Sequence, residues 1–179
     1  MRLEQRALIA ANLVDRFESC LHQPAHRDDG VVIRSHIRQG RVRVLQHESP
    51  GAVICGQIDG HGMRLFQIYS AGNFIHATED TPYFQLGEHK YGKPILDRVT
   101  QADMRLGDAA KLVLLSFDST LRSNLSVGMP IDMLLYERDA LDVRRVHRIE
   151  ESNAYFRKLS GAWSEALRNS VSRMEPFEP

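Results

Sequence analysis

A glycine-rich segment in the middle of the chain has the spacing of a phosphate-binding loop. Residues Gly87 to Lys93 match the pattern GxxxxGK, in which backbone N–H groups and the lysine hold phosphate oxygens. The segment follows Tyr83 to Leu86, which we predict to be a strand end, and precedes a helical pattern. Pro94 stands where Ser or Thr would bind magnesium, and its ring removes an N–H group. The sequence therefore favours a glycine turn that begins a helix over a nucleotide-binding module.

Three residues near the N-terminus are of metal-ligating types. Cys20, His22 and His26 lie close in sequence and could hold zinc, but no second Cys or His pair follows at metal spacing. The alternative is a solvated helix end. We predict no metal and no cofactor.

Serines cluster between a predicted helix and a predicted strand, at Ser119, Ser123 and Ser126. A nucleophilic serine needs a base and an oxyanion hole, and no motif such as GxSxG marks either of them. Short hydroxyl side chains also satisfy backbone groups in turns, so the cluster is interpreted as structural. Three nearby carboxylates are interpreted as solvated loop residues: Glu79, Asp80 and Glu88.

The first half of the chain predicts a helix followed by strands. Apolar residues at spacings of three and four predict a helix over Leu3 to Leu21. Two short strands are expected about Gln39-Gly40, where valines alternate with arginines. Ala52 to Ile58 and Arg64 to Tyr69 then predict a hairpin, and Asn73 to Ala77 a third antiparallel strand.

The second half alternates helices and strands. Helical spacing predicts one helix that begins near the glycines and runs through Val99, and a second over Ala110 to Leu121. Ile131 to Glu137 predicts a strand, and Asp142 to Ile149 an edge strand paired with it. Phe156 to Val171 predicts an amphipathic helix.

Composition limits the classes of function. The chain has 179 residues, 42% of them hydrophobic and 26% charged, with a formal net charge of zero. We therefore expect one domain spanning residues 1–179, without nucleic-acid or membrane partners. Two cysteines form no disulfide framework, and the N-terminus has no apolar run like that of a signal peptide. Cytoplasmic location is the expectation.

Three long strings carry a family resemblance. CGQIDG, RLFQIYSAGNFIHATEDTPYFQLGEHKYGKPILDR and SFDSTLRSNLSVGMPIDMLLYERDAL resemble the bacterial proteasome-type proteases called Anbu, proposed ancestral relatives of proteasome β subunits. The resemblance covers residues 54–179 clearly and 1–53 poorly. It implies an α+β fold, the four-layer αββα sandwich of the N-terminal-nucleophile hydrolases, here N-terminally incomplete.

The resemblance also implies a reaction and its residues. The family reaction uses an N-terminal threonine as nucleophile and its α-amino group as base. The first threonine of this chain is Thr78, so we expect no catalytic residue to be retained. In proteasome β subunits two turns brace the threonine amine. Their counterparts here are Leu86-Gly87-Glu88 and Ser123-Asn124-Leu125-Ser126, which makes Gly87, Ser123 and Ser126 accessory candidates.

Two functions remain open. The first is a threonine peptidase of the proteasome type that acts on peptides or unfolded proteins within a ring-like homo-oligomer, this chain being inactive alone. The alternative is a non-catalytic assembly or regulatory subunit of such a ring.

Overall fold

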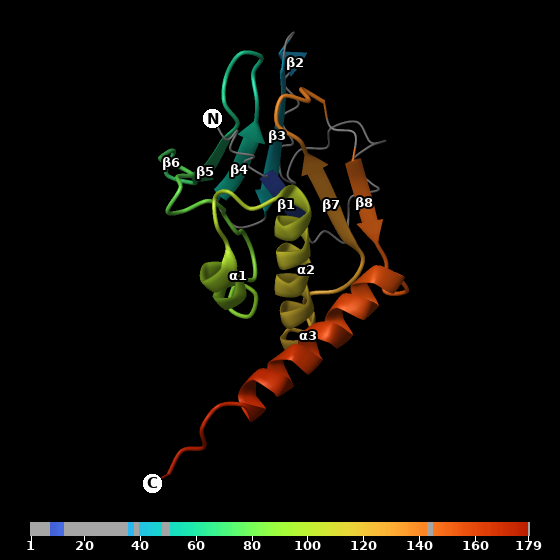
Figure 1. Ribbon diagram of the computed structural model, residues 1–179. Coiled ribbons are helices and arrows are strands. Elements are labelled where there is room, and N and C mark those ends of the chain that lie inside the picture. Colours follow the sequence, from blue (N-terminus) through green and yellow to red (C-terminus); the bar gives the residue numbers. More distant parts are fainter. Residues whose placement is uncertain (1–7, 13–35, 38–39, 48–50, 143–144, 179) are drawn as a thin grey trace.

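The computed structural model describes residues 8–12, 36–37, 40–47, 51–142 and 145–178 (Figure 1). In these ranges the chain forms two antiparallel sheets and three helices, which matches the predicted mixture of strands and helices. No helix in the described ranges combines the length and the apolar character that crossing a bilayer requires.

The larger sheet has five strands in sequence order. They are β2 (His36–Ile37), β3 (Gly40–His47), β4 (Gly51–Gly56), β5 (Arg64–Tyr69) and β6 (Phe74–His76). β2 and β3 confirm the strands expected about Gln39-Gly40, and β4 to β6 confirm the three adjacent antiparallel strands. Val53, Cys55 and Gln57 are buried at every second position, as expected for one face of a strand that packs inward.

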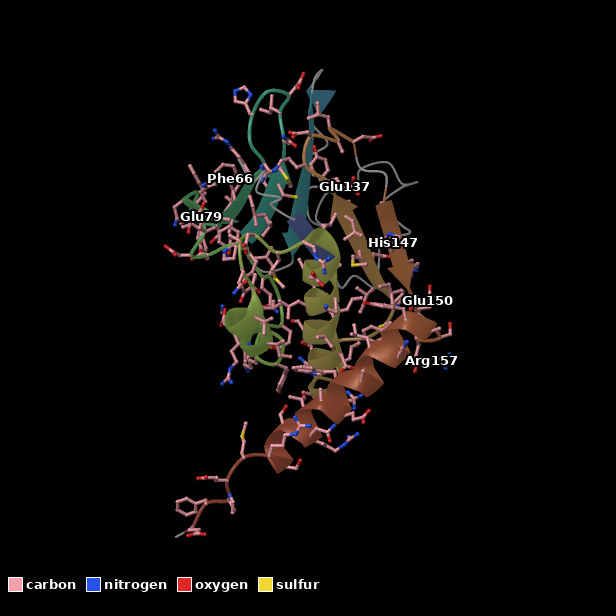
Figure 2. All side chains as sticks on the ribbon, in the orientation of Figure 1. Phe66, Glu79, Glu137, His147, Glu150 and Arg157 are labelled. Carbon is pink, nitrogen blue, oxygen red and sulfur yellow. The ribbon has the colours of Figure 1, made fainter. Side chains whose placement is uncertain are left out.

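The smaller sheet has the order β1-β7-β8, with strands β1 (Leu8–Asn12), β7 (Ile131–Tyr136) and β8 (Arg145–Ile149). β7 and β8 confirm the predicted strand and its edge partner. Figure 2 shows His147 of this sheet and Phe66 of the larger one on opposite sides of the molecule. In Figure 1, β5 and β6 lie toward one side of the molecule and β7 and β8 toward the other.

β1 contradicts the helix predicted over Leu3 to Leu21. Residues Leu8 to Asn12 pair antiparallel with β7, from Leu8 opposite Tyr136 to Asn12 opposite Asp132. β7 is the central strand and needs backbone partners on both edges, and this long-range requirement outweighs a local helical period. The remainder of the predicted helix lies outside the described residues.

The helices lie where the sequence predicts them. They are α1 (Lys93–Val99), α2 (Leu106–Ser123) and α3 (Ala154–Ser172). Residues 83–86, however, form no strand. Side-chain hydrogen bonds hold this segment in place of strand pairing. The Tyr83 hydroxyl donates to Asp97 Oδ1 over 2.5 Å, and Gln85 Nε2 donates to the Glu88 carbonyl over 3.1 Å.

α2 is buried on two opposite faces. Ala110 and Leu114 belong to the core cluster that also contains Ile131 and Met133 of β7. Leu112, Ser116 and Thr120 are also buried. At about 100° per residue, these three residues lie about 200° round the helix from Ala110 and Leu114. The face that they form meets the start of α1 at Gly92. α2 therefore joins the smaller sheet to the segment that carries the glycines.

Candidate functional site

Two turns from distant parts of the chain meet at the C-terminal end of α2. The glycine turn (Gly87–Gly92) begins with Gly87 at φ 79°, a left-handed conformation that favours glycine. The serine turn (Ser123–Ser126) begins at the last residue of α2. Asn124 Nδ2 donates to Glu88 Oε2 over 2.7 Å and joins the two turns across 36 residues of sequence. The structure thus brings together the segments that hold Gly87, Ser123 and Ser126.

Asn124 organises the serine turn as well. Its Oδ1 accepts hydrogen bonds from the Ser126 backbone N–H at 2.9 Å and from the Ser126 hydroxyl at 2.7 Å. This is the local pattern by which Asn side chains stabilise turns. The Ser126 hydroxyl therefore donates to an amide oxygen, which is not a general base. The serine turn supplies an oriented hydroxyl rather than an activated nucleophile.

Glu88 is a partly exposed loop carboxylate, and it also makes specific hydrogen bonds that the sequence does not predict. Its Oε1 accepts from the Lys90 backbone N–H at 2.8 Å and its Oε2 from Asn124. These hydrogen bonds, the Lys90 N–H first, hold the pKa of Glu88 below its usual value. The ionised carboxylate is thus fixed between the two turns. An Asn two residues before Ser126 was a usable sequence signal for the serine turn, but the contact to Glu88 is long-range.

We predict that Asn124→Ala raises the pKa of Glu88 part of the way toward its usual value. The substitution removes one donor to the ionised carboxylate and keeps the stronger one, the Lys90 N–H. A ¹³C-carboxyl NMR titration of the chain measures this pKa directly.

The control for this titration is Leu125→Ala. Leu125 is the neighbouring residue and its side chain is fully exposed, at 105% of its reference area. The pKa of Glu88 should stay at the wild-type value in this variant. An unchanged pKa in Asn124→Ala would contradict the contact between the turns.

The residues of the GxxxxGK pattern are engaged in packing. Gly92 is buried against α2, and a Cβ there would lie 3.0 Å from both the Ser116 carbonyl oxygen and Thr120 Oγ1. Lys93 Nζ donates to Asp97 Oδ1 over 2.8 Å and to the Tyr83 hydroxyl over 3.2 Å. The pattern is explained by the close approach of α1 to α2 and by a surface ion pair, as the glycine-turn interpretation expects.

The other candidates make no described hydrogen bond to either turn. Ser119 lies within α2, and Glu79 and Asp80 are exposed in the loop before residue 83. Thr78 lies in a turn closed by its own backbone N–H and the Thr81 carbonyl at 3.1 Å. Across the part of the chain that the structure describes, no three His, Cys, Asp or Glu residues are grouped as metal ligands. The zinc candidates Cys20, His22 and His26 lie outside that part.

Comparisons with known proteins identify relatives among the solved structures. Neither a protein-family model nor a curated protein sequence matches the chain. Anbu from Hyphomicrobium sp. strain MC1 is 66% identical over 72% of this chain and 55% of its own, with a TM-score of 0.70. Anbu (ancestral β-subunit) from Yersinia bercovieri is 47% identical over 72% and 55%, with a TM-score of 0.69. The chain from the helical assembly of the Anbu complex of Pseudomonas aeruginosa is 50% identical over 72% and 53%, with a TM-score of 0.68.

The similarity extends along most of this chain but covers only part of each relative. The chain spans 53–55% of the length of these relatives. At 47–66% identity over 72% of its residues, the chain belongs to the Anbu family, the ancestral β-subunit proteins that resemble proteasome subunits.

Proposed function

We propose that this protein functions as part of a proteasome-type threonine peptidase. It supplies accessory residues of the active site, which lie around the nucleophile. In this proposal the nucleophile is an N-terminal threonine, which none of the first 77 residues of this sequence provides. A chain with accessory donors alone can stabilise charge but cannot form the acyl-enzyme. The 179 residues of this sequence are therefore proposed to be inactive toward peptides by themselves.

The observation that carries the proposal is the hydrogen bond from Asn124 to Glu88. The two turns that it joins are those that the family pattern places around the threonine amine. Together they offer the Glu88 carboxylate and the Ser126 hydroxyl, at fixed positions. A carboxylate held in its ionised form stabilises an adjacent ammonium group, which is the protonated state of the amine when that amine acts as base. Gly87, Ser123 and Ser126 keep their proposed accessory roles.

The proposal includes the whole family architecture. Residues 1–179 form a single domain, part of a four-layer αββα sandwich, which acts in the cytoplasm on peptides or unfolded proteins. Copies of the chain associate, as the helical assembly solved for the Pseudomonas aeruginosa relative supports. No cofactor, nucleic acid or membrane takes part.

The second candidate is a non-catalytic subunit that contributes only to assembly. It is favoured by the exposed apolar residues Leu167 and Val171 of α3, which a contact with another subunit would remove from water. Self-association without labelling by peptide epoxyketones fits both candidates in the isolated chain. The two candidates are distinguished by adding a chain of the same family that has an N-terminal threonine. The peptidase proposal predicts that the epoxyketone labels that threonine, and that this labelling falls at least about tenfold when the present chain carries Glu88→Gln.

The isolated chain tests the proposal most simply. We predict that it is not labelled by a peptide epoxyketone, which forms an adduct with the hydroxyl and the free amine of an N-terminal threonine together. The control is a known N-terminal-threonine hydrolase treated in parallel. Labelling of the isolated chain would contradict the proposal.

A further inference from the structure

The strand β6 forms one edge of the larger sheet, and no described strand lies on its outer side. The sheet order ends at β6, which pairs with β5. Every residue of β6 is exposed, Phe74 at 63% and Ile75 at 42%. Figure 1 shows β6 at the margin of the molecule, on the side away from the smaller sheet. Within the described part of the chain, this strand edge is therefore open to another segment.

Hydrogen bonds at the two ends of β6 fix which of its backbone groups face β5. Before the strand, the Tyr69 N–H donates to the Asn73 carbonyl over 2.9 Å. After the strand, the Ala77 N–H donates to the Leu65 carbonyl over 2.9 Å. Backbone direction alternates along a strand, so Ile75, midway between these positions, also directs its N–H and carbonyl toward β5. The sheet thus uses the inner side of β6.

The other two residues of β6 direct their backbone groups outward. Phe74 and His76 lie at the alternate positions, so the N–H and the carbonyl of each point away from β5. No hydrogen bond among the described residues satisfies these groups. An extended chain beside β6 can bond to all of them as a strand does, whereas the backbone groups of a helix bond to each other. The open hydrogen bonds therefore specify an extended backbone as the occupant.

Turns at both ends limit the open edge to a short segment. At one end the Gly72 N–H donates to the Tyr69 carbonyl over 2.9 Å, with Gly72 at φ 86°. At the other end the Thr78 N–H donates to the Thr81 carbonyl over 3.1 Å. β6 itself contains no proline, lysine or acidic residue, the residues that commonly prevent pairing at a strand edge. The edge therefore suits a peptide segment of a few residues.

Aromatic side chains line one face of the sheet at this edge. The Phe66 ring centroid of β5 lies 5.8 Å from that of Phe74 and 4.8 Å from that of His76. In an added strand, the residues opposite Phe74 and His76 project to this same face. Aromatic residues at those two positions would remove the exposed Phe74 ring from water, and an apolar residue between them would contact Ile75 on the other face. The expected ligand is an extended peptide with aromatic residues at alternate positions.

We propose that the open edge of β6 binds an extended apolar peptide as an additional strand of the larger sheet. The N–H groups of Phe74 and His76 donate to peptide carbonyls, and their carbonyls accept from peptide N–H groups. Two aromatic side chains of the peptide pack beside Phe66. This binding makes and breaks no covalent bond, so it does not depend on the proposed peptidase function.

The test is fluorescence anisotropy of the full chain with a fluorescein-labelled peptide, Glu-Thr-Phe-Val-Phe-Thr-Lys. N-methylation of both peptide phenylalanines removes the N–H groups that face β6, and it should weaken binding by at least about tenfold. N-methylation of both threonines is the matched control. Their N–H groups face away from β6, so the affinity should stay at that of the parent peptide. Equal effects of the two methylation patterns, or no binding of the parent peptide, would overturn the proposal.

A substitution in β6 tests where the peptide binds. Phe74→Lys removes the aromatic contact and places a charge at the edge, so it should weaken binding by at least about tenfold. The matched control, Phe177→Lys, makes the same exchange at a residue that is 90% exposed near the C-terminus, and it should bind like the wild type. Circular dichroism reports whether each variant is folded.

Two results with these variants would contradict the proposal. Wild-type affinity of the peptide for folded Phe74→Lys would show that the peptide binds elsewhere. Sedimentation velocity of the same proteins tests for another occupant. A wild type that associates through β6, loses this association in Phe74→Lys and does not bind the peptide would show that a second copy of the chain occupies the edge.

Discussion

Gly92→Ala should lower the free energy of unfolding by about 1–3 kcal/mol, the usual cost of forcing an extra methyl group into a packed interior. The new Cβ would collide with Ser116 Oγ and would lie 3.0 Å from the Ser116 carbonyl oxygen. Ser116 and Thr120 are only 5% and 4% exposed, so neither residue can move aside freely. Urea denaturation followed by circular dichroism measures the change.

Gly107→Ala is the control for this effect. Gly107 lies in the first turn of α2, and no atom stands within 4 Å of a Cβ built there. The chain should gain up to about 1 kcal/mol from the better helix propensity of alanine. In the double variant Gly92→Ala/Ser116→Ala, loss of the Ser116 hydroxyl should recover part of the stability. If the double variant is no more stable than an additive sum predicts, the close approach of α1 to α2 is not the cause.

Gln57→Leu should destabilise the protein by about 2–3 kcal/mol, since it leaves buried backbone and side-chain groups without their hydrogen bonds. Gln57 is 4% exposed and connects the larger sheet to the turn after β7. Its Oε1 accepts from the Asp139 N–H at 2.8 Å, and its Nε2 donates to the His61 carbonyl at 2.8 Å and to Asp139 Oδ1. Asp139 has φ 62°, a strained conformation for a residue other than glycine, and these bonds help to hold it.

The same substitution at exposed Gln101 is the control and should change stability by less than about 0.5 kcal/mol. Gln57→Glu adds a sharper test. A carboxyl group at position 57 would be buried and would face Asp139, so the pKa of the introduced group should rise on folding. The folded state would then bind more protons than the unfolded state, and the lost stability should return as the pH falls through the raised pKa. A Gln57→Leu variant as stable as the wild type would show that the sheets are joined by other contacts.

Local sequence patterns predicted most of the elements and few of the contacts between them. The spacing of apolar residues in α2 and the turn between β4 and β5 are local signals, and both elements lie where they were predicted. β1 was predicted as a helix because its strand partner, β7, lies more than a hundred residues away. A run of five residues, four of them apolar, does not contain that information.

In the candidate site, too, the sequence indicated the segments but not the contact between them. The resemblance directed attention to Gly87, Ser123 and Ser126, yet the contact that joins their turns is made by their neighbours Glu88 and Asn124. A carboxylate in a polar loop has the same local pattern whether it is solvated or bonded to a turn 36 residues away. Likewise the helical period of α3 is clear from the sequence, but the period does not tell that Phe156 lies in the core while Leu167 and Val171 are exposed.

The central proposal is that these 179 residues supply accessory groups of a threonine peptidase site and do not themselves react as its nucleophile. Its most direct measurement is the intact mass of the folded chain after treatment with a peptide epoxyketone. The claim predicts a single species at the untreated mass of 20.4 kDa, while an N-terminal-threonine hydrolase in the same experiment gains one probe. A mass increase of one probe on this chain, blocked by prior treatment with a peptide aldehyde, would contradict it.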